Sequence, residues 1–227
     1  MRQKYTPEGL PVVTKETILS LRDIIKREIK KDRCEFLVRS FLYRLKEENL
    51  LVLKLVGDFV IESLKDEDLK NEYFSGAFIT YESLRRQYAS NKLEKEIASI
   101  KPLESEKETL NEYYTIKTKE GEIKFPKYTF NGLPAISEDT YISLNDTITD
   151  KTKPEKFLRE YIDRLKEQNT NLYESIMERS DELEKFYHLS EEEKVKRCGV
   201  CLIGASIVYE IIRRQTEANK LKEQFKL

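Results

Sequence analysis

The chain of 227 residues holds few of the residues that interrupt helices, with only seven glycines and six prolines. Because these two residues mark most turns, their scarcity predicts few turns and long helices. Charged residues make up 37% of the chain, above the usual share of about a quarter. Apolar residues, at 39%, still suffice for a core. This combination is typical of amphipathic helices rather than of disorder, so we expect an all-α protein.

Cysteine and histidine are scarce as well, and their scarcity limits the disulfides, zinc sites and catalytic triads that the chain could form. Three cysteines are too few for a disulfide framework, and this favours a reducing cytoplasm. Cys198 and Cys201 have Cys-x-x-Cys spacing but lie in an apolar helical pattern, and only Cys34 and His188 remain to complete a zinc site. We interpret the pair as small buried residues. His188, the one histidine, precedes a helix start at which Ser190 and Glu193 are predicted to form a capping box. A catalytic role is uncommon in such a position.

Long apolar runs and phosphate-binding motifs are also missing from the sequence. No stretch approaches about 18 uncharged apolar residues, so no membrane span is expected. The first residues, MRQKYTPEGLPVV, lack the apolar core of a signal peptide. Neither a Gly-x-Gly-x-x-Gly nor a Gly-x-x-x-x-Gly-Lys-Ser/Thr motif occurs. We therefore expect no cofactor and no metal.

The charges nearly balance, with 41 basic and 42 acidic residues. Such a balance is not that of a protein dominated by phosphate contacts, although it leaves room for a local basic patch. The most basic stretch, Arg22–Arg33, carries six basic and three acidic residues. It is either a nucleic-acid or acidic-partner contact, or a solvated helix face.

Three segments of the first half recur in the same order in the second half. The matched pairs are Tyr5–Leu21 with Tyr128–Leu144, Cys34–Asn49 with Pro154–Asn169, and Gly76–Leu93 with Gly204–Leu221. The last pair is identical at eleven of eighteen positions. We interpret the chain as a tandem duplication of a unit of roughly four helices. Thr14 or Ser137 is expected to cap the first helix of a unit, and the second helix is expected to end at Asn49 or Asn169.

The predicted organisation is therefore unit one over 1–100, a linker over 101–127 and unit two over 128–227. We predict that the units pack as a pseudo-two-fold bundle, with the long fourth helices near the pseudo-axis. In the linker, polar and apolar residues alternate in the stretch YYTIKTKEGEIKFPKY on both sides of Glu120-Gly121. This pattern predicts a β-hairpin with its turn at these two residues. Because a lone hairpin is marginally stable in water, we expect it to pack on a unit or on a partner.

Three consecutive residues of the fourth helix are the same in both units and are the candidate binding residues. They are Arg85, Arg86 and Gln87 in unit one, and Arg213, Arg214 and Gln215 in unit two. Helical spacing predicts that Glu82 faces Arg86 and that Gln87 faces Asn91, with the same pairs in unit two. Two interpretations stay open. In one, these helices are packing elements whose arginines bridge neighbouring helices; in the other, the arginines and glutamines contact an anionic or protein ligand.

With no catalytic motif in the sequence, we predict a non-enzymatic protein-interaction module, that is, a scaffold, adaptor or inhibitor with a protein partner. The alternative is a nucleic-acid-binding protein that uses the repeated Arg-Arg-Gln helices or the Arg22–Arg33 stretch. A third hypothesis is an enzyme with a carboxylate or arginine site between the units. Self-association into a homo-oligomer is compatible with all three.

Overall fold

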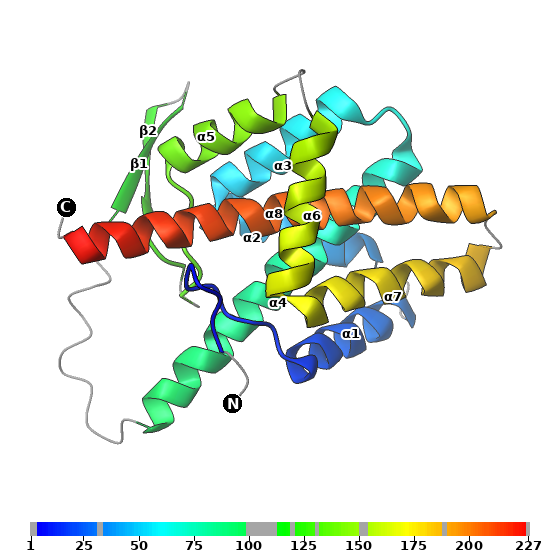
Figure 1. Ribbon diagram of the computed structural model, residues 1–227, viewed down its shortest axis with the longest axis horizontal. Helices are drawn as coiled ribbons and strands as arrows, with labels where there is room; N and C mark the ends of the chain where they lie inside the picture. Colours follow the sequence, from blue (N-terminus) through cyan, green and yellow to red (C-terminus); the bar gives the residue numbers. More distant parts are fainter. Residues whose placement is uncertain are drawn as a thin grey trace.

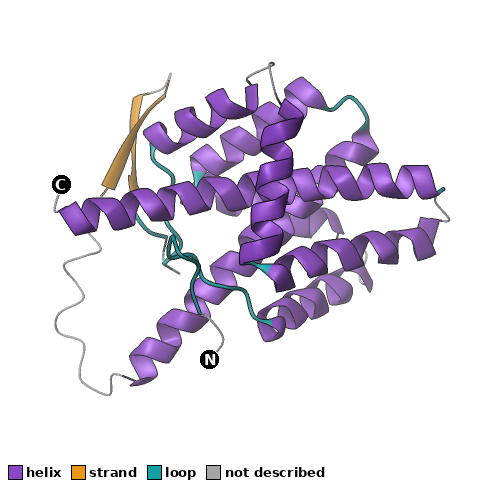
Figure 2. Cartoon of the chain, viewed as in Figure 1, coloured by secondary structure: helices purple, strands orange, loops and turns teal. Residues whose placement is uncertain are grey.

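Helices make up most of the computed structural model of the protein, as the composition predicts (Figure 1, Figure 2). The structure describes residues 4–30, 34–98, 113–118, 121–129, 132–149, 154–187 and 190–225. His188 and most of the predicted linker before the hairpin lie outside these residues, as does the end of the basic stretch at 31–33.

The described part of each half contains four helices. In the first half these are α1 (Lys15–Lys30), α2 (Cys34–Glu48), α3 (Leu50–Ser63) and α4 (Glu67–Ala98). In the second half they are α5 (Glu138–Thr149), α6 (Pro154–Gln168), α7 (Thr170–Tyr187) and α8 (Glu191–Phe225). The prediction of an all-α fold is therefore confirmed.

The predicted helix caps are present. Thr14 Oγ1 accepts a hydrogen bond from the backbone N–H of Thr17 at the start of α1. Ser190 and Glu193 form the predicted capping box at the start of α8, because each side chain accepts the other residue's backbone N–H. Asn49 interrupts the helical pattern between α2 and α3, again as predicted.

The two long helices, α4 and α8, share the most extensive helix–helix contact in the described structure. They run in the same direction, cross in their first halves and diverge towards their C-termini (Figure 1). At the crossing, a Cβ atom on Gly76 would lie 1.9 Å from the carbonyl oxygen of Cys201, and one on Gly204 would lie 2.1 Å from that of Tyr73. Only glycine allows the two backbones to approach so closely.

The first helix of each half packs on the third helix of the other half. Helix α1 contacts α7, and α5 contacts α3. Arg22 of α1 forms an ion pair with Glu178 of α7, and the Tyr141 hydroxyl of α5 donates a hydrogen bond to Asp58 of α3 over 2.9 Å. The two halves are therefore interleaved rather than placed side by side.

The segments that lead into α1 and α5 cross to the other half in the same way. Asn169 accepts a hydrogen bond from the Val13 N–H over 2.6 Å and donates to the Pro11 carbonyl over 3.3 Å. Asn49 accepts from the Ile136 N–H over 2.9 Å and donates to the Pro134 carbonyl over 3.2 Å. Each asparagine thus ties the entry segment of one half to the α2–α3 or α6–α7 corner of the other.

One hydrophobic core joins both halves. It includes side chains of the run Leu50–Val60, among them Val52 and Val56, which are fully buried. The apolar face of this run is therefore buried, although Lys54 within it is exposed. Ile61, directly after it, is 81% exposed and marks the outer side of α3.

The predicted hairpin is present, with strands β1 (Tyr113–Thr118) and β2 (Gly121–Pro126). The strands pair antiparallel, with Ile116 opposite Ile123. The hairpin lies beyond α5 and the C-terminal end of α8 (Figure 1), and it makes no extensive contact with any described helix. It therefore stands off the helical body. Among the described helices, none is both long and apolar enough to cross a membrane.

Candidate functional site

Two of the candidate residues, Gln87 and Gln215, are buried and organise the starts of α1 and α5. The Gln87 side-chain oxygen accepts hydrogen bonds from the backbone N–H of Thr14 and the hydroxyl of Thr17. Gln215 accepts from the N–H and hydroxyl of Ser137 in the same manner. Both glutamines also donate to the asparagine one turn on, as predicted, over 2.9 Å. These contacts give the glutamines a structural role.

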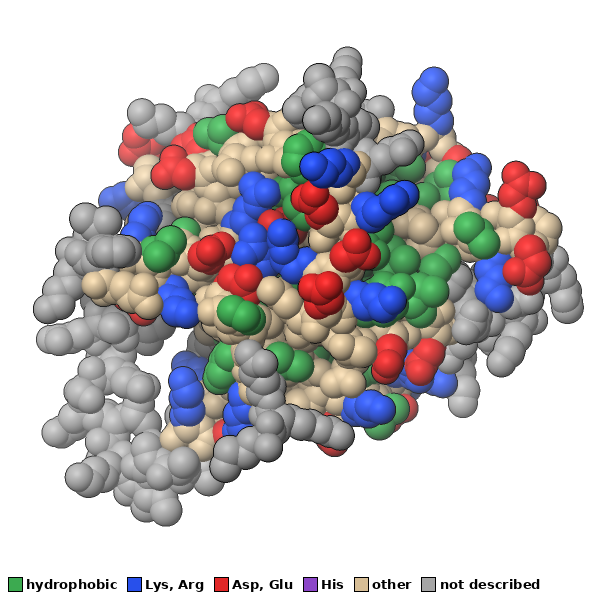
Figure 3. All heavy atoms as spheres, viewed as in Figure 1, with side chains coloured by type: hydrophobic (Ala, Val, Ile, Leu, Met, Phe, Trp, Pro, Cys, Tyr) green, Lys and Arg blue, Asp and Glu red, His purple; other side chains and the backbone are tan. Residues whose placement is uncertain are grey.

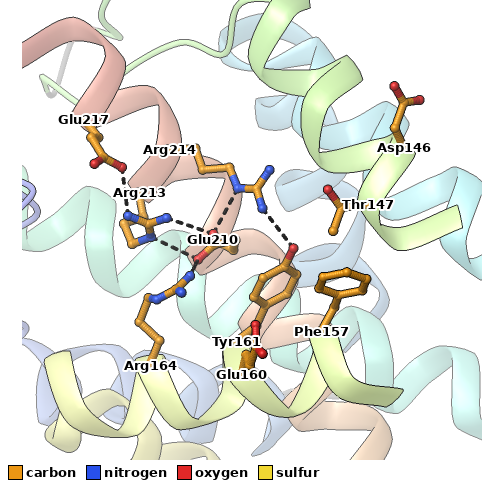
Figure 4. A pocket seen from close by; sticks show the side chains of 10 residues that line it. All are labelled: Asp146, Thr147, Phe157, Glu160, Tyr161, Arg164, Glu210, Arg213, Arg214 and Glu217. Atoms are coloured by element: carbon orange, nitrogen blue, oxygen red, sulfur yellow. Dashed lines mark hydrogen bonds and ion pairs between the residues drawn. The ribbon is translucent and has the colours of Figure 1, made fainter. Parts of the chain in front are cut away.

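The arginines of α8 surround a buried carboxylate, that of Glu210, which is 1% exposed. Arg213 donates to both carboxylate oxygens through Nε and Nη2, over 3.0 and 2.9 Å. Arg214 Nε donates over 2.9 Å, which confirms the predicted pair one helical turn apart. Arg164 of α6 adds a third guanidinium at 2.6 Å (Figure 4). One carboxylate thus holds three guanidinium groups in place.

The two arginines of α8 also link neighbouring segments. Arg214 Nη1 donates to the hydroxyl of Ser143 in α5 over 3.1 Å, and Nη2 donates to the hydroxyl of Tyr161 in α6 over 3.0 Å. Arg213 Nη1 donates to Glu217 over 3.0 Å and to Glu8 of the first half over 3.4 Å. The bridging interpretation of these arginines therefore describes their contacts in the second half.

The electrostatics of this network follow from burial and charge. Burial acts to raise the pKa of Glu210, but hydrogen bonds and charges from Arg213, Arg214 and Arg164 outweigh it and lower that pKa below its usual value. For Arg213, burial acts to lower the pKa, and the carboxylates around it raise the pKa overall. Glu210 is therefore ionised throughout the physiological range.

An open pocket of about 590 Å³ lies over this network. Its walls combine the guanidinium groups with the rings of Phe157 and Tyr161, and acidic side chains including Glu160 and Asp146 stand at its edge (Figure 4). On the molecular surface, basic side chains gather near the middle of this face and acidic ones surround them (Figure 3). The basic groups are already neutralised by acidic neighbours.

The first half holds a matching arrangement around Glu82, which is 2% exposed. Arg85 donates to this carboxylate through Nε and Nη2, over 3.1 and 2.9 Å, and Arg44 of α2 donates through Nη1. Arg86 Nε lies 3.9 Å from the carboxylate. That distance confirms the predicted ion pair but is too long for a hydrogen bond.

Sequence reasoning missed Arg44 and Arg164, which complete the two clusters from α2 and α6. A signal was present, because both arginines occupy the same place in the matched segments YRLKEEN and DRLKEQN. Their contact with the α4 and α8 carboxylates depends on tertiary packing, which spacing along one helix does not reveal.

The cysteine pair has ordinary surroundings. Cys201 is buried and Cys198 is partly buried, and neither is in a disulfide bond. Cys198 Sγ lies 3.5 Å from Met177 Sδ. Within the described residues, no group of three or more His, Cys, Asp or Glu side chains is arranged to hold a metal ion.

Comparison of the chain with protein-family models, with curated proteins and with solved structures gives no match.

Proposed function

We propose that the protein is a non-enzymatic interaction module: a fused pseudo-dimer of two four-helix units that presents its surface to a protein partner. The observation that carries this proposal is the β1–β2 hairpin. A two-stranded sheet has two open edges and is marginally stable in water unless something covers it. Because the hairpin has little contact with the described helices, a protein that pairs with an edge or packs on a face would stabilise it.

Reciprocal contacts support the pseudo-dimer. Gly76 meets Cys201 while Gly204 meets Tyr73, and these positions exchange under the repeat offset of 128. Tyr88 and Thr216, also 128 apart, approach each other with their hydroxyl oxygens 3.5 Å apart. A residue that touches its own counterpart is expected on a two-fold axis. We infer that units over 1–100 and 128–227 descend from a unit that paired with a second copy of itself.

The polar groups of the second-half network favour an interaction module over a nucleic-acid-binding protein. Arg213 and Arg214 donate to Glu210, Glu217 and Tyr161, so a nucleic acid would have to displace these acceptors. Arg22 of the basic stretch is likewise paired with Glu178. Through these contacts the second-half arginines link α5, α6 and α8, so few of their donors are free to bind phosphate.

The test is an affinity pull-down of the full chain from native lysate, with and without nuclease, beside a variant in which a flexible linker of equal length replaces residues 113–126. We expect one protein to be recovered from either lysate by the full chain and lost with the variant, while circular dichroism shows unchanged helix content. Partners that disappear with nuclease would favour nucleic-acid binding. Equal recovery by both forms would remove the hairpin from the interface.

A further inference from the structure

The two arginine clusters differ in how many acceptors surround them. In the second half, Arg214 donates hydrogen bonds to the hydroxyls of Tyr161 and Ser143. Arg213 donates to the carboxylates of Glu217 and Glu8. In the first-half cluster of Arg44, Arg85 and Arg86, two of the matching acceptors are absent, because Phe41 stands in place of Tyr161 and Ala89 in place of Glu217.

This loss leaves donors of the first-half cluster without partners. Arg86 Nε is buried and, within the described residues, has no hydrogen-bond acceptor. Arg44 and Arg85 donate to Glu82 alone among the described acceptors. The side chains nevertheless reach the surface, with 31% of Arg44 and 29% of Arg86 exposed. An incoming group can therefore reach them.

The same helix carries other unsatisfied groups. In the part of the chain that the structure describes, the buried side-chain polar atoms without a partner all lie on α4: Tyr73 OH, Thr80 Oγ1, Ser83 Oγ, Arg86 Nε and Asn91 Nδ2. The matching residues of α8 are apolar at Val208 and Ile211, whereas Arg214 and Asn219 have partners. Because buried unpaired polar groups cost stability, their concentration on one helix suggests a functional reason.

We propose that the first-half arginine cluster binds a carboxylate from an acidic segment of the protein partner. This inference rests on the proposed interaction function. The second half indicates the chemistry, because there Nη1 of Arg213, the counterpart of Arg85, donates to two carboxylates, those of Glu217 and Glu8. The carboxylate of Glu8 reaches Arg213 from a different part of the chain, as a partner's carboxylate would reach Arg85.

The surroundings of the cluster suit an acidic segment. Burial lowers the pKa of Arg86, and the charges of Arg85 and Arg44 lower it further, while Glu82 only partly offsets them. An added carboxylate would relieve this strain between like charges. Beside Arg44, an open pocket of about 550 Å³ on α2 gives room for uncharged residues of the segment, since Glu47 and Glu48 line it together with Arg39 and Tyr43. Among the acidic residues of this pocket, only Glu48 has no acidic counterpart in the second half. The matching residue there is Gln168.

The experiment titrates a hexaglutamate peptide into the full chain at low ionic strength and follows the arginine Nε–Hε signals by NMR. We expect saturable shifts of the Arg85 and Arg86 signals. Ala89→Glu restores the acceptor found at Glu217 and should weaken binding about tenfold, the effect of losing one charge-assisted hydrogen bond. Ala89→Gln, of equal size and no charge, is the matched control and should bind within about twofold of the natural chain.

A second variant changes affinity in the opposite direction. Glu48→Gln removes a carboxylate that competes for Arg44 and Arg85, so it should tighten peptide binding. Equal affinities of Ala89→Glu and Ala89→Gln, or no shift of Arg86 with peptide, would overturn the proposal. So would inorganic pyrophosphate shifting Arg86 where hexaglutamate does not, since the site would then recognise phosphate. A partner still captured by Ala89→Glu in pull-down would refute this site and leave the interaction function standing.

Discussion

Glu210 is the residue on which the second-half network depends. It is almost fully buried and receives hydrogen bonds from three arginines on two helices. Removing one member of a buried ion network leaves the others uncompensated, and this costs more than the network itself contributes. The carboxylate therefore holds α6 against α8 through its charge as well as its shape.

Replacing Glu210 with Gln is expected to lower the free energy of unfolding by about 3–5 kcal/mol, measured by urea denaturation, because three guanidinium groups lose their counter-charge. Glu217→Gln is the control. Glu217 is 48% exposed and contacts only Arg213 of the network, so its loss should cost less than about 1 kcal/mol. Equal losses for the two variants would contradict this account of the network.

The same residue predicts how stability depends on pH. The folded-state pKa of Glu210 is lowered from its ordinary value of 4.5, so its contribution is present above pH 4.5 and is lost as the pH falls through the folded-state pKa. The natural chain should lose stability over this acidic range more steeply than Glu210→Gln, which has no carboxyl to protonate. Urea denaturation at a series of acidic pH values measures the difference.

At the scale of elements, the crossing of α4 and α8 fixes how the two halves meet. Gly76 and Gly204 each face the backbone of the other helix, where the nearest atom is a carbonyl oxygen rather than a flexible side chain. The end of a flexible side chain could rotate away from an added methyl group, but a backbone carbonyl within a helix cannot. The helices would have to separate along the whole contact.

Gly204→Ala should therefore lower the free energy of unfolding by at least about 3 kcal/mol, since overpacking here forces a backbone shift. Gly199→Ala, on the same helix, has nothing within 4 Å of the added atom. It should instead raise stability by about 0.5–1 kcal/mol, because alanine favours a helix more than glycine does. Thermal denaturation of the two variants provides the comparison, and destabilisation by both would contradict close packing as the cause.

At the scale of the whole molecule, the halves are bound by contacts that neither half can make alone. The entry segment at Pro11 and Val13 needs Asn169, and the segment at Pro134 and Ile136 needs Asn49. Helices α1 and α5 also pack on the third helix of the opposite half. Folding of one half is therefore coupled to folding of the other.

A chain cut after residue 105 tests this coupling. The fragments 1–105 and 106–227 should copurify in equal amounts when produced together, and each alone should show reduced helix content by circular dichroism, because its entry segment and first helix lack their binding surface. Two fragments that fold separately and fail to associate would contradict the interleaved arrangement and, with it, the proposed pseudo-dimer.

The sequence by itself determined the helices, their caps and the hairpin, because these depend on residues close together along the chain. Scarce glycine and proline predicted long helices, and the repeated segments predicted about four helices in each half. The Ser190–Glu193 box and the Glu210–Arg214 pair followed from helical spacing alone. The hairpin strands followed from alternation about Gly121. In each case the partner residues lie no more than 13 positions apart along the chain.

Only the tertiary structure decided which half each segment contacts and which arginine donor lacks a hydrogen-bond acceptor. Asn49 and Asn169 looked like simple helix breaks, yet they bind entry segments far away in sequence. The different surroundings of Arg86 and Arg214 depend on Phe41 and Tyr161, side chains from another helix. Such contacts depend on how helices pack in space, and a one-dimensional pattern carries no information about which neighbour will be opposite.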